Sequence, residues 1–147
     1  MPSIRGTYGR RGPIVHAWIG ASAPLQSLLR RQEHSVPQRI RLELLIDTGA
    51  DTTTLNEMHM RSLGIPVRGA TDVRGITTDV DATECNTYDV EFELINVVGD
   101  KGLLLPAIEV IGRPFHNEMI DGLIGRDVLG SVVFTLEGPN RQFIVNY

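Results

Sequence analysis

The sequence predicts a small, mostly β domain with one or two short helices, and three observations support this. Several segments alternate polar and apolar residues as half-buried strands do. Turn-forming residues separate these segments, and helical periodicity is confined to short stretches. A length of 147 residues corresponds to one domain with an adequate core. We therefore expect a single domain over residues 1–147, in which residues 1–12 form a flexible arm.

Alternation and turn residues locate the expected strands. Residues 39–44 alternate polar and apolar side chains and continue into an apolar pair, so this strand should enter the core. Residues 103–110 are typical of a buried strand, but Pro106 within them indicates an edge position or a β-bulge. A C-terminal hairpin is expected around the turn residues 138–140. The remaining strands are expected at residues 14–19, 88–94, 132–136 and 142–145.

Two short helices are expected from their ends. Asn56 can cap a helix over residues 57–63, and Gly64 supplies the left-handed residue that stops it. Residues 24–33 begin with proline and carry leucines on one face. A last helical turn is expected after Arg126.

The composition excludes several classes of protein. Hydrophobic residues make up 41% of the chain, which is too many for a wholly disordered protein. A formal charge of −4 argues against a dedicated nucleic-acid binder. Cys85 is the one cysteine, so neither an intrachain disulfide nor a cysteine-rich zinc site can form. The chain has no apolar run near the ~18 residues of a membrane span, and its first residues fit a strand better than a secretory signal. We expect a cytoplasmic protein with no nucleic-acid or membrane partner.

The most informative stretch is residues 44–51, Leu-Leu-Ile-Asp-Thr-Gly-Ala-Asp. An apolar strand ends at Asp47, so the carboxylate emerges from a hydrophobic element. Thr48 supplies a hydroxyl that can lock a turn, and Gly49 allows a sharp turn and the close approach of another backbone. On its own, the stretch is also typical of a strand that ends in an Asx-type turn.

A second segment changes this interpretation. Residues 119–129 are another apolar run, which contains Gly125-Arg126-Asp127 and which alone would indicate a buried strand entering a capped helix. The two motifs together resemble the retroviral-type (retropepsin-like) aspartic proteases. In that family an apolar pair precedes Asp-Thr-Gly-Ala, and an apolar run ends in Gly-Arg-Asp or Gly-Arg-Asn. The resemblance covers roughly residues 14–147 and is closer to the soluble bacterial or cellular members than to the viral ones.

The resemblance implies a small closed β-barrel and an aspartic-type endopeptidase that acts on peptides as a homodimer. The chain has one Asp-Thr-Gly, so Asp47 of each of two identical chains would flank one water molecule. One carboxylate would take a proton from the water, and the other, protonated, would donate to the scissile carbonyl. The active site would lie on the two-fold axis of an isologous interface. No metal and no cofactor is implied.

The resemblance also implies supporting roles around Asp47. Thr48 would form a hydrogen bond across the two-fold axis, and Gly49 would present its carbonyl to the substrate backbone. Asp51 and Arg126 would form an ion pair that orients the loop, with Ala50 completing the motif.

A β-hairpin flap closes the substrate cleft in this family, and residues 72–83 are the expected place for it. Gly75, Ile76 and Thr77 would lie at its tip, where a single glycine departs from the glycine-rich viral pattern. An extended peptide would pair with the flap backbone. Residues 143–147 are apolar enough either for a sheet shared between two chains or for the core of one.

An alternative function is a non-catalytic peptide-binding or dimerisation module on the same fold. Metal chemistry has little support, because the histidines have no metal-binding spacing. These histidines are His16, His34, His59 and His116. Cys85 would need a neighbouring base to act as a nucleophile, so a packed side chain is the expected role.

Overall fold

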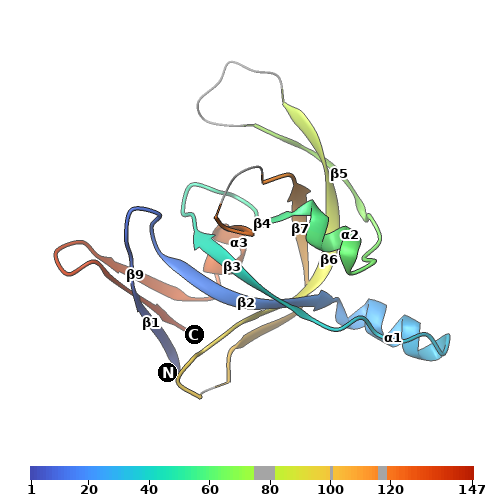
Figure 1. The fold of residues 1–147 in the computed structure, drawn as a ribbon, viewed down its shortest axis with the longest axis horizontal. Coiled ribbons are helices and arrows are strands. Elements are labelled where there is room, and N and C mark those ends of the chain that lie inside the picture. Colours follow the sequence, from blue (N-terminus) through green and yellow to red (C-terminus); the bar gives the residue numbers. More distant parts are fainter. Residues whose placement is uncertain (75–81, 100, 116–118) are drawn as a thin grey trace.

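A closed β-barrel forms the centre of the computed structural model, which describes residues 1–74, 82–99, 101–115 and 119–147 (Figure 1). Six strands follow one another around the barrel, and the last pairs back onto the first. In spatial order these are β2 (Ile14–Ala21), β3 (Ile40–Ile46), β8 (Gly122–Ile124), β4 (Thr54–Asn56), β7 (Leu103–Arg113) and β6 (Thr83–Leu94). The mostly β class that the sequence pattern predicts and the closed barrel that the family resemblance implies are both confirmed.

One further strand extends the barrel sheet. β5 (Gly69–Val73) pairs antiparallel with the outer part of β6, from Gly69 opposite Thr87 to Val73 opposite Thr83. Figure 1 shows this two-stranded hairpin reaching beyond the barrel, on the side toward which the loop after β3 also points.

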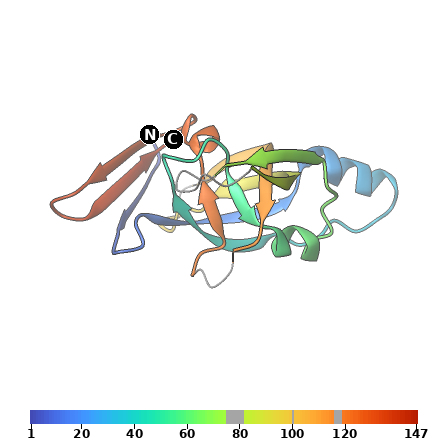
Figure 2. The ribbon, with the colours of Figure 1, turned by 90° about the horizontal axis from the view of Figure 1, so that it is seen from above.

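A separate three-stranded antiparallel sheet lies beside the barrel and contains both chain ends (Figures 1 and 2). Its middle strand is β10 (Gln142–Asn146), which pairs with β9 (Val133–Glu137) on one side and with β1 (Ser3–Thr7) on the other. The C-terminal hairpin is therefore confirmed. Within one chain, Phe143 and Val145 of β10 are buried in the core.

The strand β1 is a feature that the sequence analysis did not predict. It lies inside the segment expected as a flexible arm, and it pairs with β10 over five residues, from Ser3 opposite Asn146 to Thr7 opposite Gln142. The segment Ser-Ile-Arg-Gly-Thr contains one large apolar residue and a glycine, so its strand signal is weak. Backbone pairing with β10, which lies at the other end of the chain, stabilises a strand that the local sequence does not favour.

Of the two alternatives expected at Pro106, an edge position or a β-bulge, the structure has the bulge. Val90 of β6 pairs with Ile108, and Phe92 pairs with Leu105, so one residue of β6 faces two residues of β7. The extra residue removes the need for a ladder hydrogen bond at the proline, which has no backbone N–H. The strand continues on both sides of this position.

Among the described residues, three short helices complete the fold, and the predicted cap Asn56 and stop residue Gly64 are both in place. α1 (Ala23–Arg31) is capped by Ser22, α2 (Glu57–Ser62) is capped by Asn56 and followed by Gly64 at φ +66, and α3 (Arg126–Leu129) follows β8. α1 projects from one end of the barrel, and none of its residues is fully buried (Figure 1). Among the described residues, no helix has the length and apolar character needed to cross a membrane.

The core lies inside the barrel and is lined by the apolar side chains of its strands. Its largest members are almost completely inaccessible to solvent, among them Ile19, Leu44, Leu55, Val90, Phe92, Val110 and Ile124. β3 ends in the consecutive apolar residues 44–46 and β8 is apolar throughout, and the middle residue of each of these runs is half-buried between two buried ones.

The close approach of β8 to β4 gives the first testable prediction. A Cβ atom on Gly122 would lie 2.3 Å from the carbonyl oxygen of Thr54, whereas one on Gly138 would meet nothing within 4 Å. Gly122→Ala should therefore lower the free energy of unfolding by about 1–3 kcal/mol, the usual cost of overpacking. Gly138→Ala is the matched control. Equal urea midpoints for the two variants would contradict the proposed contact.

Candidate active site

The position of Asp47 follows from the pairing of β3 with β8. The two strands run parallel, with Leu44 opposite Gly122 and Ile46 opposite Ile124. Just beyond the pairing, the backbone N–H of Asp47 donates to the carbonyl of Ile124 over 2.9 Å. Because parallel strands end at the same edge of a sheet, the Asp-Thr-Gly and Gly-Arg-Asp motifs emerge side by side.

Asp47 begins a tight turn that also holds its own carboxylate. The carbonyl of Asp47 accepts from the N–H of Ala50 at 3.2 Å, and its Oδ1 accepts from the N–H of Gly49 at 2.9 Å. The local structure is thus the Asx-type turn that the sequence allows. Asp47 is half-buried, while Thr48 and Gly49 are exposed to solvent. The hydrogen bond from Gly49 therefore uses Oδ1 of Asp47 and leaves Oδ2 outside it, next to the exposed residues Thr48 and Gly49.

Arg126 connects this turn to α3. Its Nη1 donates to the carbonyl of Thr48 at 2.9 Å, and its Nη2 contacts the carboxylate of Asp51. The backbone N–H of Arg126 donates to the carbonyl of Ala50 at 2.9 Å. Since the Asp51 side chain is 83% exposed, the ion pair itself contributes little stability. Its effect is geometric, because one guanidinium fixes two points of the loop.

A second set of bonds, which the sequence analysis missed, lies behind the loop. The backbone N–H and the hydroxyl of Thr53 donate to the carboxylate of Asp127, at 3.0 and 2.8 Å. The same hydroxyl accepts from the N–H of Gly125 at 3.1 Å, and the N–H of Val128 donates to Asp127 at 2.8 Å. The Thr53 side chain is fully buried. We call the contacts among Thr53, Gly125 and Asp127 the loop brace.

The sequence carried only a weak sign of the loop brace. Asp127 stands in the Gly-Arg-Asp motif, where an acidic residue in the first turn of a helix is ordinary. Thr53 is one of three consecutive threonines, and nothing in the pattern separates the buried one from its neighbours. The fold makes this distinction, because β4 begins directly after Thr53 and carries it inward.

The expected flap is described in part. Its two arms correspond to β5 and β6, which pair up to Val73 and Thr83. The residues assigned to its tip, Gly75, Ile76 and Thr77, lie outside the described residues.

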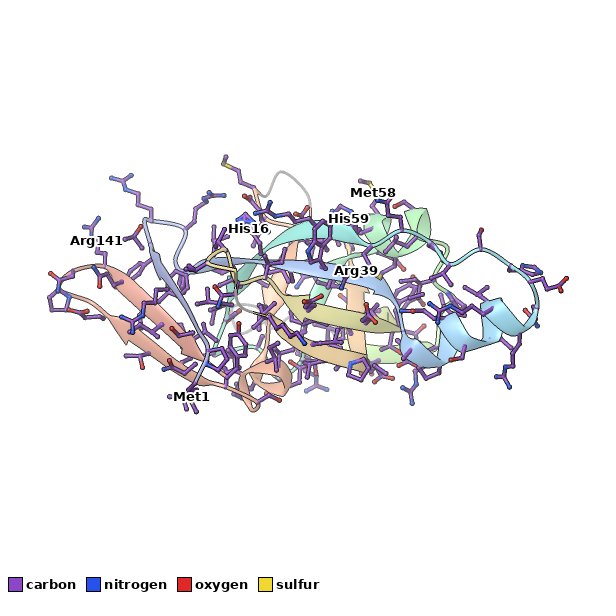
Figure 3. All side chains as sticks on the ribbon, turned by 90° about the horizontal axis from the view of Figure 1, so that it is seen from below. Met1, His16, Arg39, Met58, His59 and Arg141 are labelled. Atoms are coloured by element: carbon purple, nitrogen blue, oxygen red, sulfur yellow. The ribbon has the colours of Figure 1, made fainter. Side chains whose placement is uncertain are left out.

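Asp121, at the start of β8, is a further polar residue near the motifs. Its carboxylate accepts from the backbone N–H of Glu43 at 2.9 Å, and its other oxygen lies 2.9 Å from Nε2 of His59 on α2. In Figure 3, His59 lies against the barrel while its neighbour Met58 points away from it. These bonds secure the start of β8 against β3 and α2. In the part of the chain that the structure describes, no three His, Cys, Asp or Glu side chains gather closely enough to hold a metal ion.

One solved structure shares this architecture, and two others resemble it more weakly. A retropepsin-like aspartic protease from Rickettsia conorii matches with a TM-score of 0.60 and 15% sequence identity, covering 99% of this chain and 91% of the other. The protease of EIAV in complex with the inhibitor HBY-793 gives a TM-score of 0.48 at 20% identity, covering 86% and 93%. The retroviral protease-like domain of Ddi1 from Leishmania major gives 0.41 at 16% identity, covering 84% and 81%. At these identities, the Rickettsia match establishes the fold alone.

Family membership comes from the sequence comparison. No protein with a curated description matches the chain. The family model described as aspartyl protease matches residues 35–128, which is more than half of the sequence. The matched region includes the strand and turn of Asp47, the loop brace and the Gly-Arg-Asp motif. The chain therefore belongs to the aspartyl protease family, and its fold is retropepsin-like.

Proposed function

We propose that the protein is an aspartic endopeptidase whose active site forms between two copies of the chain. The observation that carries this proposal is the turn of Asp47, a half-buried carboxylate on a loop that Arg126 and the loop brace hold from behind. Membership of the aspartyl protease family supports the assignment of hydrolysis to this loop.

The chemistry requires two carboxyl groups around one water molecule. Asp47 in its ionised form takes a proton from the water, whose oxygen attacks the scissile carbonyl carbon. The partner's Asp47, protonated, donates its proton to the carbonyl oxygen, which gives a tetrahedral intermediate. The proton that Asp47 took from the water then passes to the amide nitrogen, and one hydroxyl of the intermediate returns a proton to the partner's Asp47; the C–N bond breaks, which releases an amine and a carboxylic acid. Two close carboxyl groups share one proton, so activity should be highest at acidic pH.

A second chain is needed because each chain supplies one Asp-Thr-Gly. In the proposed dimer, Asp47 and the partner's Asp47 face each other across a two-fold axis, and the interface is isologous. Thr48 and Gly49 are exposed in the single chain, which leaves them accessible to a partner and to substrate. Thr48 would hydrogen-bond across the axis, and the Gly49 carbonyl would accept from the substrate backbone.

The remaining site residues have supporting roles in this proposal. Ala50 and Asp51 keep the turn in shape through their bonds to α3, and Arg126 ties them together. Gly75, Ile76 and Thr77 are proposed to lie over a bound peptide, whose extended backbone would pair with the hairpin.

Replacing the proposed nucleophile activator tests the chemistry directly. Asp47→Asn removes the charge while keeping the size, so cleavage of unfolded proteins or peptides should fall by a factor of about 10³ or more. Peptide fragments detected by mass spectrometry at acidic pH provide the measurement. Equal cleavage by wild type and the variant would exclude Asp47 as the catalytic residue. Tight peptide binding by the wild type with no product after long incubation would instead favour the non-catalytic module.

Mixing the two proteins tests the shared site. If both Asp47 side chains are needed, a mixed dimer is inactive. With about a threefold excess of the Asp47→Asn chain and random pairing, activity should fall to about one quarter. An equal excess of an unrelated inert protein is the control, and substrate is kept in large excess over both. Unchanged activity, together with a strict monomer in sedimentation at high concentration, would contradict the dimer.

The loop brace gives a prediction for both stability and rate. Thr53→Val keeps the shape but removes the hydroxyl, which leaves the N–H of Gly125 buried without that acceptor. The free energy of unfolding should fall by about 1–3 kcal/mol, and kcat should fall because the loop of Asp47 loses its support. Thr52→Val is the matched control, since among the described residues its hydroxyl makes no hydrogen bond. Chemical denaturation and peptide cleavage, measured on both variants, distinguish them.

A further inference from the structure

A polar cluster at the start of α2 lies outside the loop of Asp47. The Oε1 atom of Glu57 accepts two hydrogen bonds, from the hydroxyl of Tyr88 and from Nδ2 of Asn86, each at 2.7 Å. The side chain of Glu57 is only 17% exposed, and Tyr88 is 2% exposed. Charged bonds of this kind are stronger than bonds between neutral groups. We call these three residues the hairpin anchor.

The backbone around the hairpin anchor leaves room for it. Gly112 of β7 lies opposite Asn86, and a Cβ atom at Gly112 would be 2.5 Å from the Tyr88 ring and 3.3 Å from Cγ of Glu57. Any larger residue at position 112 would force the side chains of Tyr88 and Glu57 apart. Arg61 contacts the outer oxygen of Glu57 at 3.3 Å, but it is 73% exposed and lies on the solvent side.

The anchor holds β6 where the β5–β6 hairpin begins. Thr87 is the last residue of β6 that pairs with β5, and Asn86 and Tyr88 stand on either side of it. Since alternate residues of a strand share a face, both of these side chains reach α2 together. Arg68, just before β5, makes ion pairs with Asp89 and Glu109, and these side chains are more exposed than that of Glu57.

The same anchor is directly connected to the loop of Asp47. Glu57 follows β4 without a gap, and β4 begins after Thr53 of the loop brace. β4 is itself held by β8 on one side and β7 on the other. The stretch from Asp47 to Glu57 thus carries the proposed catalytic carboxylate at one end. At its other end, Glu57 accepts hydrogen bonds from β6 where the β5–β6 hairpin begins.

We propose that Glu57 is a positioning residue, which sets the direction of the β5–β6 hairpin relative to the loop of Asp47 and thereby determines how tightly an extended peptide binds. The inference rests on the proposed peptidase function. Its effect is on substrate binding rather than on the chemical step, because Glu57 touches neither Asp47 nor the turn.

The anchor is suited to acidic conditions. The hydrogen bond from Tyr88, then the one from Asn86, hold the pKa of Glu57 below its ordinary value of 4.5; burial opposes this, and Arg61 adds to the lowering. The stabilisation is therefore fully present above pH 4.5 and is lost as the pH falls through the lower pKa of the folded state. Conversely, burial and the bond to Glu57 raise the pKa of Tyr88, so its hydroxyl stays a donor.

Peptide cleavage kinetics test the role. Glu57→Ala and Tyr88→Phe should each raise KM by about three- to tenfold with kcat within about twofold of wild type. Arg61→Ala, which removes only the outer partner of the same carboxylate, should leave both constants unchanged. In Tyr88→Phe, the rise of KM on the acid side should begin at higher pH than in wild type, because the main cause of the lowered pKa is gone.

Rescue and exchange separate this inference from the proposed function. Glu57→Gln keeps an acceptor oxygen, so its KM should remain near that of wild type and lose the acid-side dependence. Amide hydrogen exchange in residues 69–73 and 83–88 should be faster in Glu57→Ala than in Arg61→Ala, whether or not the protein cleaves peptides. If the wild type cleaves no peptide but Glu57→Ala still exchanges faster than Arg61→Ala, the peptidase function is overturned and the role of the hairpin anchor is kept. Exchange and KM equal to wild type in folded Glu57→Ala would overturn the anchor.

Discussion

The parallel pairing of β3 with β8 is the constraint on which the rest of the site depends. The two strands pair over only three residues on each side, yet they bring two motifs from distant parts of the sequence to one edge of the barrel. The residues that pair, 44–46 and 122–124, are apolar and buried or half-buried, so their register is set by the core rather than by the polar residues that follow. The bond from Asp47 to Ile124 continues this pairing into the loop. The carboxylate is thus positioned by hydrophobic packing.

Polar contacts then act in two layers around this apolar base. Near the surface, Arg126 ties together the turn of Asp47 with bonds that are exposed and individually weak. Behind it, the loop brace centres on the fully buried Thr53, and each polar group of Thr53 has a partner. Loss of a bond in this buried layer lowers the free energy of unfolding more, because a buried donor that loses its acceptor cannot form a hydrogen bond with water instead. The buried Thr53 beneath the loop therefore contributes more to its rigidity than the exposed ion pair does.

Sequence reasoning succeeded where a signal is local and failed where it is not. The turn of Asp47, the cap of Asn56 and the bulge at Pro106 are each encoded by neighbouring residues, and all three are present in the structure. β1 was missed because its stability comes from pairing with β10, at the other end of the chain. Thr53 and Glu57 were missed for a related reason. A threonine among threonines and a glutamate in a first helical turn look ordinary until the fold supplies their partners.

The stretch from Asp47 to Glu57 has a consequence for how this chain can change its length. Its start is fixed by the pairing of β3 with β8, its middle by the buried Thr53, and its end by the hydrogen bond from Tyr88 of β6 to Glu57. One residue added within β4 would turn alternate side chains to the opposite face and carry Glu57 away from β6. The segment between α1 and β3 joins no sheet before Ile40, and an insertion there leaves these contacts in place. The number of residues between Asp47 and Glu57 is therefore as much a property of the site as their identity.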